Sequence, residues 1–440
     1  MNFASAYNYL LSLQNLRRQE YMATNKHAAL HLQRLEFLLS LLDHPEKKIP
    51  HYIHVTGTSG KGSVCSYLHQ ILLANGKRVG STASPHPHTI LERWRVGRRI
   101  MRPVEFVRYV EILKPILDKY LRTTSLEPPS FFEITEAIGL LFFVEQRIEW
   151  AVMEVGCGGR YDSSNVIPNK DLAIITNIGL DHVGVIGNNK KEIAQEKAGI
   201  IKRGCWVLTN ETNPQILPIF QKEIKKTKAQ GLIRTKLKMV KNIQVNLSGT
   251  SFSYQGQEFH TPAPGIHQAH NAILAIGAAK ILNIPENQIR TGLANTHQSL
   301  CLEITGQHPL VVSDGAHNPN KIKTTVQTIQ QMFPDKTKIH LVIGFSADKN
   351  IKSMVRSLAT LQPTSIACTR QTINPFRQTA NPAELAKMFS CFCSSRLVNS
   401  FLDPHQALAW SRTQEQKNPG IILVTGSIFL SGELTMDTLG

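Results

Sequence analysis

The chain has 440 residues, of which 42% are hydrophobic and 18% are charged, and these proportions exclude a disordered or fibrous protein. The length exceeds one ordinary hydrophobic core, so we expect two domains, with three left open. The 49 basic and 32 acidic residues give a formal charge of +17, which suits acidic small substrates, nucleic acid or an anionic membrane and does not choose among them.

The first part of the chain alternates helical and strand patterns. Apolar residues at helical spacing predict helices over 27–43, 62–76, 130–147 and 267–282. Continuous apolar runs predict strands over 52–57, 150–156 and 171–179. Runs of this kind are typical of central strands in a parallel sheet, which are buried on both faces. We therefore expect a doubly wound α/β domain with a parallel sheet.

The alternation restarts after a weaker stretch. Residues 240–262 predict short strands and turns, such as a hairpin. Strands that run into loops are then expected at 309–321, 338–350, 363–370 and 420–427. We predict a larger first domain over 1–297 and a smaller, Rossmann-like α/β domain over 298–440.

Nucleic acid and membrane are both poor partners for this sequence. The densest basic run, 222–242, has no aromatic residues for base stacking and is interpreted as a solvated helix and loop. No segment has the length of a membrane span, and the N-terminus lacks a signal core. Seven cysteines are scattered, with only Cys391 and Cys393 close together, which indicates reduced thiols. We expect a cytoplasmic protein.

The stretch "HVTGTSGKGSV" (54–64) predicts a phosphate-binding loop between a strand and a helix. Gly57, Gly60 and Gly62 allow several backbone N–H groups to converge on an anion at the start of the helix. Lys61 adds a positive charge for the β- and γ-phosphates of a nucleoside triphosphate. The standard loop has Ser or Thr after the lysine as a Mg²⁺ ligand, but here the next hydroxyl is that of Ser63.

Candidate metal ligands follow two other strands. Glu154 ends the run "WAVME", and Asp181 and His182 follow the run at 171–179. The carboxyl ends of neighbouring parallel strands share one edge of a sheet, where ligands bind. From the residues alone, Glu154 is as readily incidental as functional, and a lone His182 is more often structural.

Several motifs together resemble the folylpolyglutamate synthase/dihydrofolate synthase family of the Mur ligase superfamily. The motifs are "HVTGTSGKGSV", "TASPH", "EVGCGGRYDSSN", "TNIGLDH", "EIAQEKAGIIK", "GIHQAHNA", "SDGAHNP", "SADKN" and "LVTGSIFLSGE". They occur in the family's order, from about residue 30 to the end of the chain. The resemblance implies an ATP-dependent ligase that adds L-glutamate to dihydropteroate, to reduced folates or to both, through an acyl phosphate. It implies a monomer that binds no nucleic acid and no membrane.

The resemblance also implies roles for single residues. Mg²⁺ would be held by Ser84, Glu154 and His182, so Ser63 is not needed as a metal ligand. Lys61, Lys197 and His182 are expected to be catalytic, and Lys197 matches a lysine that is carbamylated in the family. From the sequence alone, Lys197 would instead be an ordinary helix-surface lysine.

The remaining implied contacts concern ATP and the pterin-bearing acceptor. The expected ATP-binding residues are Gly57, Ser59, Gly60, Lys61, Gly62, Ser63, Asn271, Asp314 and His317. The expected acceptor-binding residues are Tyr161, Asp162, Ser163 and Phe132.

One departure from the family bears on the nucleotide. The family usually has "PGRLE" before its second domain, with an arginine on the ATP phosphates, whereas this chain has "SLCLE" (299–303). Cys301 cannot replace a guanidinium, so another cation such as Lys349 or Arg290 takes the role, or nucleotide binding is weaker. A ligase for a different acid, a weakly active nucleotide-binding member and a nucleic-acid-dependent NTPase remain as alternatives.

Overall fold

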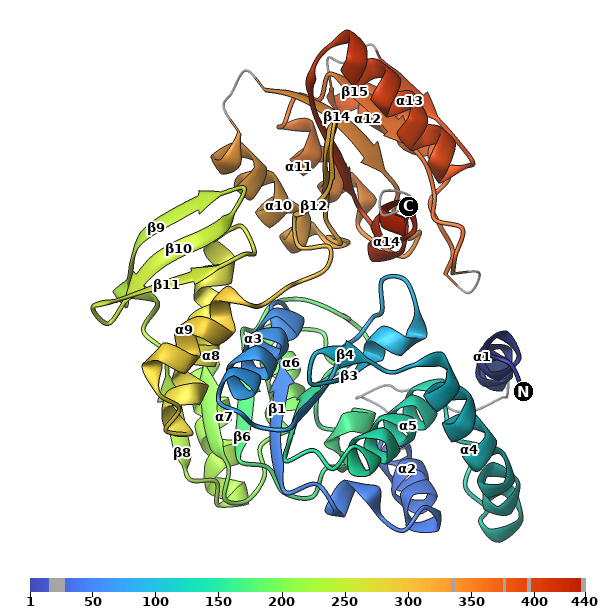
Figure 1. The fold of residues 1–440 in the computed structure, drawn as a ribbon, viewed down its shortest axis with the longest axis vertical. Helices are drawn as coiled ribbons and strands as arrows, with labels where there is room; N and C mark the ends of the chain where they lie inside the picture. The colour runs from blue at the N-terminus through green and yellow to red at the C-terminus, as the bar shows by residue number, and fades with distance from the viewer. Residues whose placement is uncertain (16–27, 334–336, 375–376, 394–396, 437–440) are drawn as a thin grey trace.

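The computed structural model describes residues 1–15, 28–333, 337–374, 377–393 and 397–436, which form two α/β lobes (Figure 1). The sheet of the first lobe has eight strands in the order β4-β3-β2-β5-β1-β6-β7-β8. These strands are β1 (His51–Thr56), β2 (Val79–Thr82), β3 (Trp94–Val96), β4 (Arg99–Ile100), β5 (Trp150–Glu154), β6 (Leu172–Ile175), β7 (Trp206–Thr209) and β8 (Gly231–Arg234). The six strands from β2 to β8 are parallel, and β3 and β4 are antiparallel.

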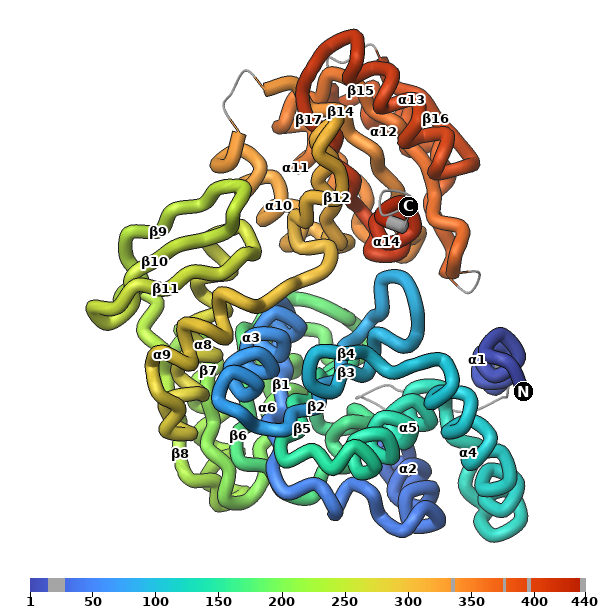
Figure 2. Tube along the Cα trace, viewed as in Figure 1, coloured from blue at the N-terminus to red at the C-terminus, as the bar shows by residue number. Residues whose placement is uncertain are grey.

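The helices of the first lobe cover both faces of this sheet, which is why its central strands are apolar throughout (Figure 2). They are α1 (Phe3–Ser12), α2 (Leu30–Leu41), α3 (Lys61–Ala74), α4 (Pro103–Thr123), α5 (Phe131–Glu145), α6 (Lys190–Ala198), α7 (Leu217–Thr227), α8 (Ile266–Ile281) and α9 (Glu286–Ala294). Met153 of β5 belongs to the core with α2, α4 and α5, whereas Val152 belongs to the core with α3 and α8.

The second lobe has a six-stranded sheet in the order β12-β13-β17-β14-β15-β16, parallel except for β12. Its strands are β12 (Glu303–Gln307), β13 (Leu310–Ser313), β14 (Lys338–Ile343), β15 (Ser365–Cys368), β16 (Val398–Ser400) and β17 (Gly420–Thr425). Its helices are α10 (Pro319–Met332), α11 (Ile351–Ala359), α12 (Pro382–Phe392), α13 (Pro404–Lys417) and α14 (Ile428–Met436). The expected α/β fold with two sheets is confirmed.

Two sequence expectations need correction. The stretch 240–262 forms a three-stranded antiparallel sheet rather than a hairpin, from β9 (Val240–Asn246), β10 (Gly249–Tyr254) and β11 (Gln257–Thr261). The basic run 222–242 contains β8 as well as the end of α7, because its short apolar centre pairs with β7. The part of the helix expected from residue 27 that precedes residue 28 lies outside the described residues.

The two lobes touch near the loop that follows β2. The side-chain position of Gly432 in α14 faces the backbone of Pro87, and any Cβ there would collide with the Pro87 carbonyl oxygen. Within the described part of the chain, no helix combines the length and the apolar character that a membrane span requires.

A buried ion pair fixes α5, which carries the aromatic residues expected to contact the acceptor. Ser130 and Glu133 form a capping box at the start of α5. Arg34 of α2 donates to Glu133 at 2.9 Å, and both side chains are only 1% exposed. Burial opposes ionisation of Glu133, but the hydrogen bond from His31 and the charge of Arg34 lower its pKa below the ordinary value.

We expect Arg34→Met to lower the free energy of unfolding by about 3–5 kcal/mol, because it removes the charge that balances a buried carboxylate. Arg108→Met is the matched control, since the Arg108–Glu145 pair is 48% and 42% exposed, and its loss should cost less than about 1 kcal/mol. Urea unfolding followed by tryptophan fluorescence measures both. Equal losses in the two variants would contradict this account of α5.

Candidate functional site

The loop between β1 and α3 is shaped by its neighbours. Gly57 and Gly60 have φ angles of +151° and +83°, in the region that favours glycine. A Cβ on Gly57 would collide with Thr176, and a Cβ on Gly60 would collide with the side chain of Asn271. The N–H of Ser59 donates to the Asn177 side chain at 3.0 Å, and Thr176 Oγ1 donates to the Ser59 carbonyl at 2.6 Å. The end of β6 therefore holds the loop in place.

The start of α3 is open to an anion. Gly60 is the N-cap residue and supplies no side-chain cap, and the first intrahelical bond runs from Val64 N to Gly60 O at 3.0 Å. The N–H groups of the first turn, which includes Gly62 and Ser63, therefore lack a side-chain acceptor at the positive end of the helix dipole. This is the geometry in which backbone amides bind phosphate.

Lys61 and Lys197 converge on one atom of the loop. Their ammonium groups donate to the carbonyl oxygen of Gly57 at 3.1 and 3.0 Å. Burial, and then the nearby charge of Lys61, lower the pKa of Lys197 to about 7. Lys197 is thus a buried amine with a large uncharged fraction at neutral pH, and not the helix-surface lysine that the sequence alone suggests.

Glu154 and Ser84 lie together at the same rim. Val55 of β1 pairs with Glu154 in the sheet, and Glu154 Oε2 accepts a hydrogen bond from Ser84 N at 3.1 Å. A Cβ on Gly62 would lie 3.6 Å from Glu154 Oε2, so this carboxylate faces the first turn of α3. Carboxylate and hydroxyl oxygens are ligands that suit Mg²⁺, so this pair fits such an ion.

His182 is more exposed than Glu154 and lies beside Asp181. Its backbone has a φ of +49°, and its imidazole is 44% exposed and 3.8 Å from the Asp181 carboxylate. Burial lowers the pKa of His182, and so do the charges of Lys61, Lys197 and Lys349. The charge of Asp181 opposes this effect. Among the described residues, no group of three His, Cys, Asp or Glu side chains is arranged to hold a metal ion. The role of His182 as a metal ligand stays a prediction.

The residues expected to bind the acceptor form a compact segment after β5. Asp162 accepts hydrogen bonds from the N–H groups of Cys157 and Ser164 at 2.8 and 3.0 Å and caps the 3₁₀ turn Ser163–Val166. Tyr161 N donates to Glu196 beside Lys197. The segment thereby lies against α6, but both Asp162 oxygens already have backbone partners.

An aromatic and charged cluster lies on the other side of this segment. The guanidinium of Arg93 lies 5.6 and 5.7 Å from the ring centres of Phe131 and Phe132, and Phe132 is 59% exposed. Glu136, which the sequence did not single out, has a buried oxygen with no hydrogen-bond partner in the described structure. Burial and the charge of Asp162 raise the pKa of Glu136 to about 8. The exposed ring beside buried polar groups suits a flat heterocycle.

The two residues of the second lobe that were expected to bind ATP, Asp314 and His317, both have hydrogen-bond partners within that lobe. Asp314 accepts from Leu302 N at 3.2 Å, from Ala316 N at 3.1 Å and from Thr325 Oγ1 at 2.6 Å, all within its own lobe. His317 Nδ1 is bonded to the Gly315 carbonyl at 2.8 Å, and the charge of Lys321 together with burial lowers its pKa to about 3. Asp314 thus holds together the chain around Leu302, the loop at Ala316 and helix α10. Its contact with nucleotide stays a prediction.

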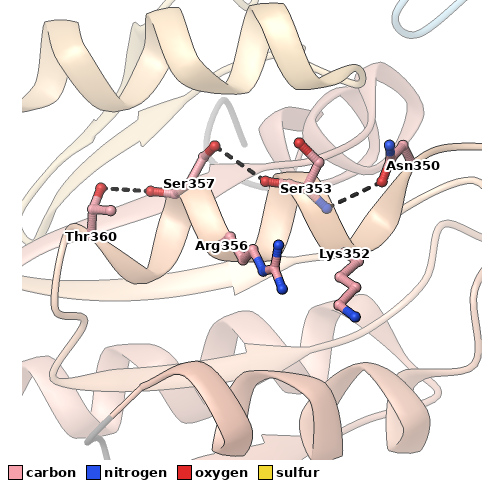
Figure 3. Close-up of a pocket in the computed structure, with 6 residues that line it drawn as sticks. All are labelled: Asn350, Lys352, Ser353, Arg356, Ser357 and Thr360. Atoms are coloured by element: carbon pink, nitrogen blue, oxygen red, sulfur yellow. Dashed lines mark hydrogen bonds between the residues drawn. The ribbon is translucent and has the colours of Figure 1, made fainter.

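A separate groove on the second lobe follows α11 (Figure 3). It is lined by Asn350, Lys352, Ser353, Arg356, Ser357 and Thr360. Its polar groups mostly serve the helix itself: Asn350 caps Ser353 N, and Ser357 and Thr360 donate to carbonyls one turn earlier. The groove does not include any residue expected to bind a substrate.

Comparison with known proteins places this geometry. Residues 119–279 match the Mur ligase middle domain, and residues 302–428 match the Mur ligase, glutamate ligase domain. The Bacillus subtilis protein named dihydrofolate synthase/folylpolyglutamate synthase is 32% identical over 417 residues, covering 92% of this chain and 94% of the relative. The chain belongs to the dihydrofolate synthase/folylpolyglutamate synthase family.

Other members of this family agree over the full length. Folylpolyglutamate synthase of Lacticaseibacillus casei is 29% identical to this chain. The match covers 100% of this chain and 99% of the relative. The Mycobacterium tuberculosis folylpolyglutamate synthase complexed with ADP superposes with a TM-score of 0.88 at 26% identity, over 99% of this chain and 98% of that chain. The expected family is confirmed.

We expect Gly60→Ala to weaken ADP binding about tenfold or more, because moving a loop N–H away from a phosphate loses a charge-assisted hydrogen bond of about 1.5–3 kcal/mol. Gly76→Ala is the control. Gly76 also has a positive φ, +71°, but a Cβ there meets nothing within 4 Å and lies at the far end of α3. Titration calorimetry with ADP compares the variants. Equal affinities would show that the loop does not contact the nucleotide.

Proposed function

We propose that the protein is an ATP-dependent, ADP-forming ligase that joins L-glutamate to the carboxylate of dihydropteroate, of a reduced folate, or of both. The observation that carries this proposal is the rim of the first sheet, where an uncapped helix start, Lys61 and the Glu154–Ser84 pair lie together. The B. subtilis relative carries both activity names, and the M. tuberculosis structure contains ADP.

In this proposal ATP lies on the loop, and its phosphates accept from the N–H groups between Gly57 and Ser63. The side chain of Asn271 abuts Gly60, and we propose that it contacts the adenosine. Glu154, Ser84 and His182 would hold Mg²⁺, which when bound neutralises charge on the phosphate oxygens. Lys61 supplies a further positive charge at the site of transfer.

The acceptor would lie along the segment with Tyr161, Asp162 and Ser163, with its ring against Phe132. Its carboxylate attacks the γ-phosphate, which yields an acyl phosphate and ADP. The α-amino group of L-glutamate then attacks the acyl carbon, and phosphate leaves. Activation is required because a carboxylate is a poor electrophile. The second lobe, for which we propose a boundary between residues 297 and 298, would exclude water from the acyl phosphate by closing on the first.

The proposal is tested with purified protein, ATP, Mg²⁺ and L-glutamate, with dihydropteroate and tetrahydrofolate supplied separately. We expect ADP release that depends on one or both acceptors, and a product heavier by one glutamate residue in mass spectrometry. Lys61→Met serves as the inactive control. ADP release without a glutamylated product, or silence with both acceptors while ATP still binds, would mean a different acid substrate. Size-exclusion chromatography tests the expected monomer.

We further propose that Lys197 is carbamylated. CO₂ reacts only with the uncharged amine, and a pKa near 7 makes that form available at neutral pH. The carbamate would be an anion close to the ammonium group of Lys61, since both lysines donate to the Gly57 carbonyl.

Carbamate occupancy and activity should therefore rise together as the pH increases through about 7, because the ammonium form dominates below it. ¹³C NMR with labelled bicarbonate measures occupancy. We expect activity to fall in CO₂-free buffer, and Lys197→Ala to lose most activity and regain part of it with a short-chain carboxylate. Lys190→Ala, which removes an exposed lysine of the same helix, is the control. No labelled carbamate and no CO₂ dependence would contradict the proposal.

A further inference from the structure

Lys321 lies in the first turn of α10, and its side chain has no partner of its own. The backbone N–H of Lys321 donates to the capping side chain of Asn318 at 2.9 Å, and its carbonyl accepts from Thr325. These bonds fix the backbone at the start of the helix. Over the described ranges of the chain, no hydrogen bond or salt bridge engages its ammonium group, although the side chain is partly buried.

The surroundings of this ammonium come from both lobes. It interacts electrostatically with Lys61, Asp181 and Glu154 of the first lobe. It also interacts with Cys301, which lies between α9 and β12. On its own side it acts on Asp314 and His317. Burial and the charge of Lys61 lower the pKa of Lys321. Lys321 thus lies among charged groups of both lobes, on a helix whose Thr328 Oγ1 is 3.0 Å from the Cβ position of Gly265 in the first lobe.

Backbone contacts hold Lys321 in this position. The loop before α10 is bonded to the segment between α9 and β12. Gly315 N donates to Leu300 O at 2.7 Å, and Leu302 N donates to Asp314 at 3.2 Å. Leu300 and Leu302 have φ angles of +55° and +52°, which are costly for a side chain with a Cβ. Cys301 lies between them. The start of α10 and Cys301 are therefore fixed side by side.

Cys301 itself brings no charge to this place. Burial and the Asp314 carboxylate raise the pKa of the Cys301 thiol to about 12, so it is neutral at physiological pH. The two cations that the sequence suggested for this role are already paired. Lys349 bonds to Asp348 at 3.1 Å, and Arg290 bonds to Glu286 at 2.6 Å on the far side of α9. Of these three cations, Lys321 is the one for which the described part of the chain shows no side-chain hydrogen bond or ion pair, and it acts electrostatically on Cys301.

We infer that Lys321 binds the terminal phosphates of ATP from the second lobe, opposite Lys61, and so links nucleotide binding to the contact between the lobes. Two ammonium groups that face each other across a gap repel, and a polyphosphate between them converts this repulsion into attraction. The assignment rests on the proposed function, because it takes the space beside Lys61 as the phosphate site. It places Lys321 in the position of a phosphate-binding cation that neither Arg290 nor Cys301 can supply.

The test compares binding of AMPPCP and AMP to the full-length protein by titration calorimetry. Lys321→Met should weaken AMPPCP binding by about 10- to 100-fold, the value of a charge-assisted contact, and change AMP binding by less than about twofold. Lys323→Met is the matched control, because Lys323 is exposed on the same helix. Lys321→Arg should retain affinity. Cys301→Arg combined with Lys321→Met should restore it by placing a cation at the neighbouring position.

The assignment is wrong if Lys321→Met binds AMPPCP as Lys323→Met does, or if it weakens AMP and AMPPCP equally. It is also wrong if Lys321→Arg, which preserves the charge, loses as much affinity as Lys321→Met. The proposed ligase activity is measured separately, as glutamate addition by the wild-type protein, so its failure is distinguishable from failure of this assignment.

Discussion

Two ammonium groups, those of Lys61 and Lys197, share one acceptor, the carbonyl oxygen of Gly57. Burial, and then the charge of Lys61, lower the pKa of Lys197 to about 7, so its amine is partly uncharged at neutral pH. The loop carries positive potential at the positive end of α3. A phosphate bound at this point would be attracted by Lys61 and by the N–H groups of the first turn of α3.

The architecture delivers that potential to one edge of the sheet. β1, β5 and β6 are adjacent and parallel, so the loop, Glu154 and the segment at Thr176 emerge together. Thr176 and Asn177 hold the loop through direct hydrogen bonds within the protein. A preorganised loop spends little free energy on reorganisation when charge develops on the phosphates.

The segment proposed to bind the acceptor lies next to the proposed metal ligands. Asp162 lies close to Gly156, whose Cβ position is 3.3 Å from an Asp162 oxygen and 4.0 Å from Ser84 Oγ. The segment that we propose binds the acceptor and the proposed metal ligand Ser84 are thus neighbours, as attack of an acceptor carboxylate on a phosphate would require. Glu136, whose pKa is raised to about 8 by burial and by the charge of Asp162, and Arg93, which lies over the Phe132 ring, continue this region with polar and aromatic groups.

Much of this arrangement could be predicted from the sequence, and the misses have physical reasons. Strands β1, β5 and β6 were predictable because a strand buried on both faces is apolar throughout. β8 was not, because a half-exposed edge strand of four residues inside a basic run leaves little pattern.

Site residues divide in the same way. The loop glycines were predictable because a phosphate loop has a local signature, whereas Lys321 resembles any polar helix residue until the fold brings it to Lys61. The positive φ angles of Leu300 and Leu302 also left no trace, because glycine is the residue that such angles favour.

The measurement that tests the central claim most directly follows oxygen from the acceptor into phosphate. The acceptor is prepared with ¹⁸O in the carboxylate that receives glutamate and is converted with ATP, Mg²⁺ and L-glutamate. If that carboxylate attacks the γ-phosphate at the loop, each turnover transfers one ¹⁸O atom into inorganic phosphate, which mass spectrometry detects. Unlabelled phosphate, with the departing ¹⁸O recovered in water instead, would contradict the acyl phosphate and with it the role assigned to the loop.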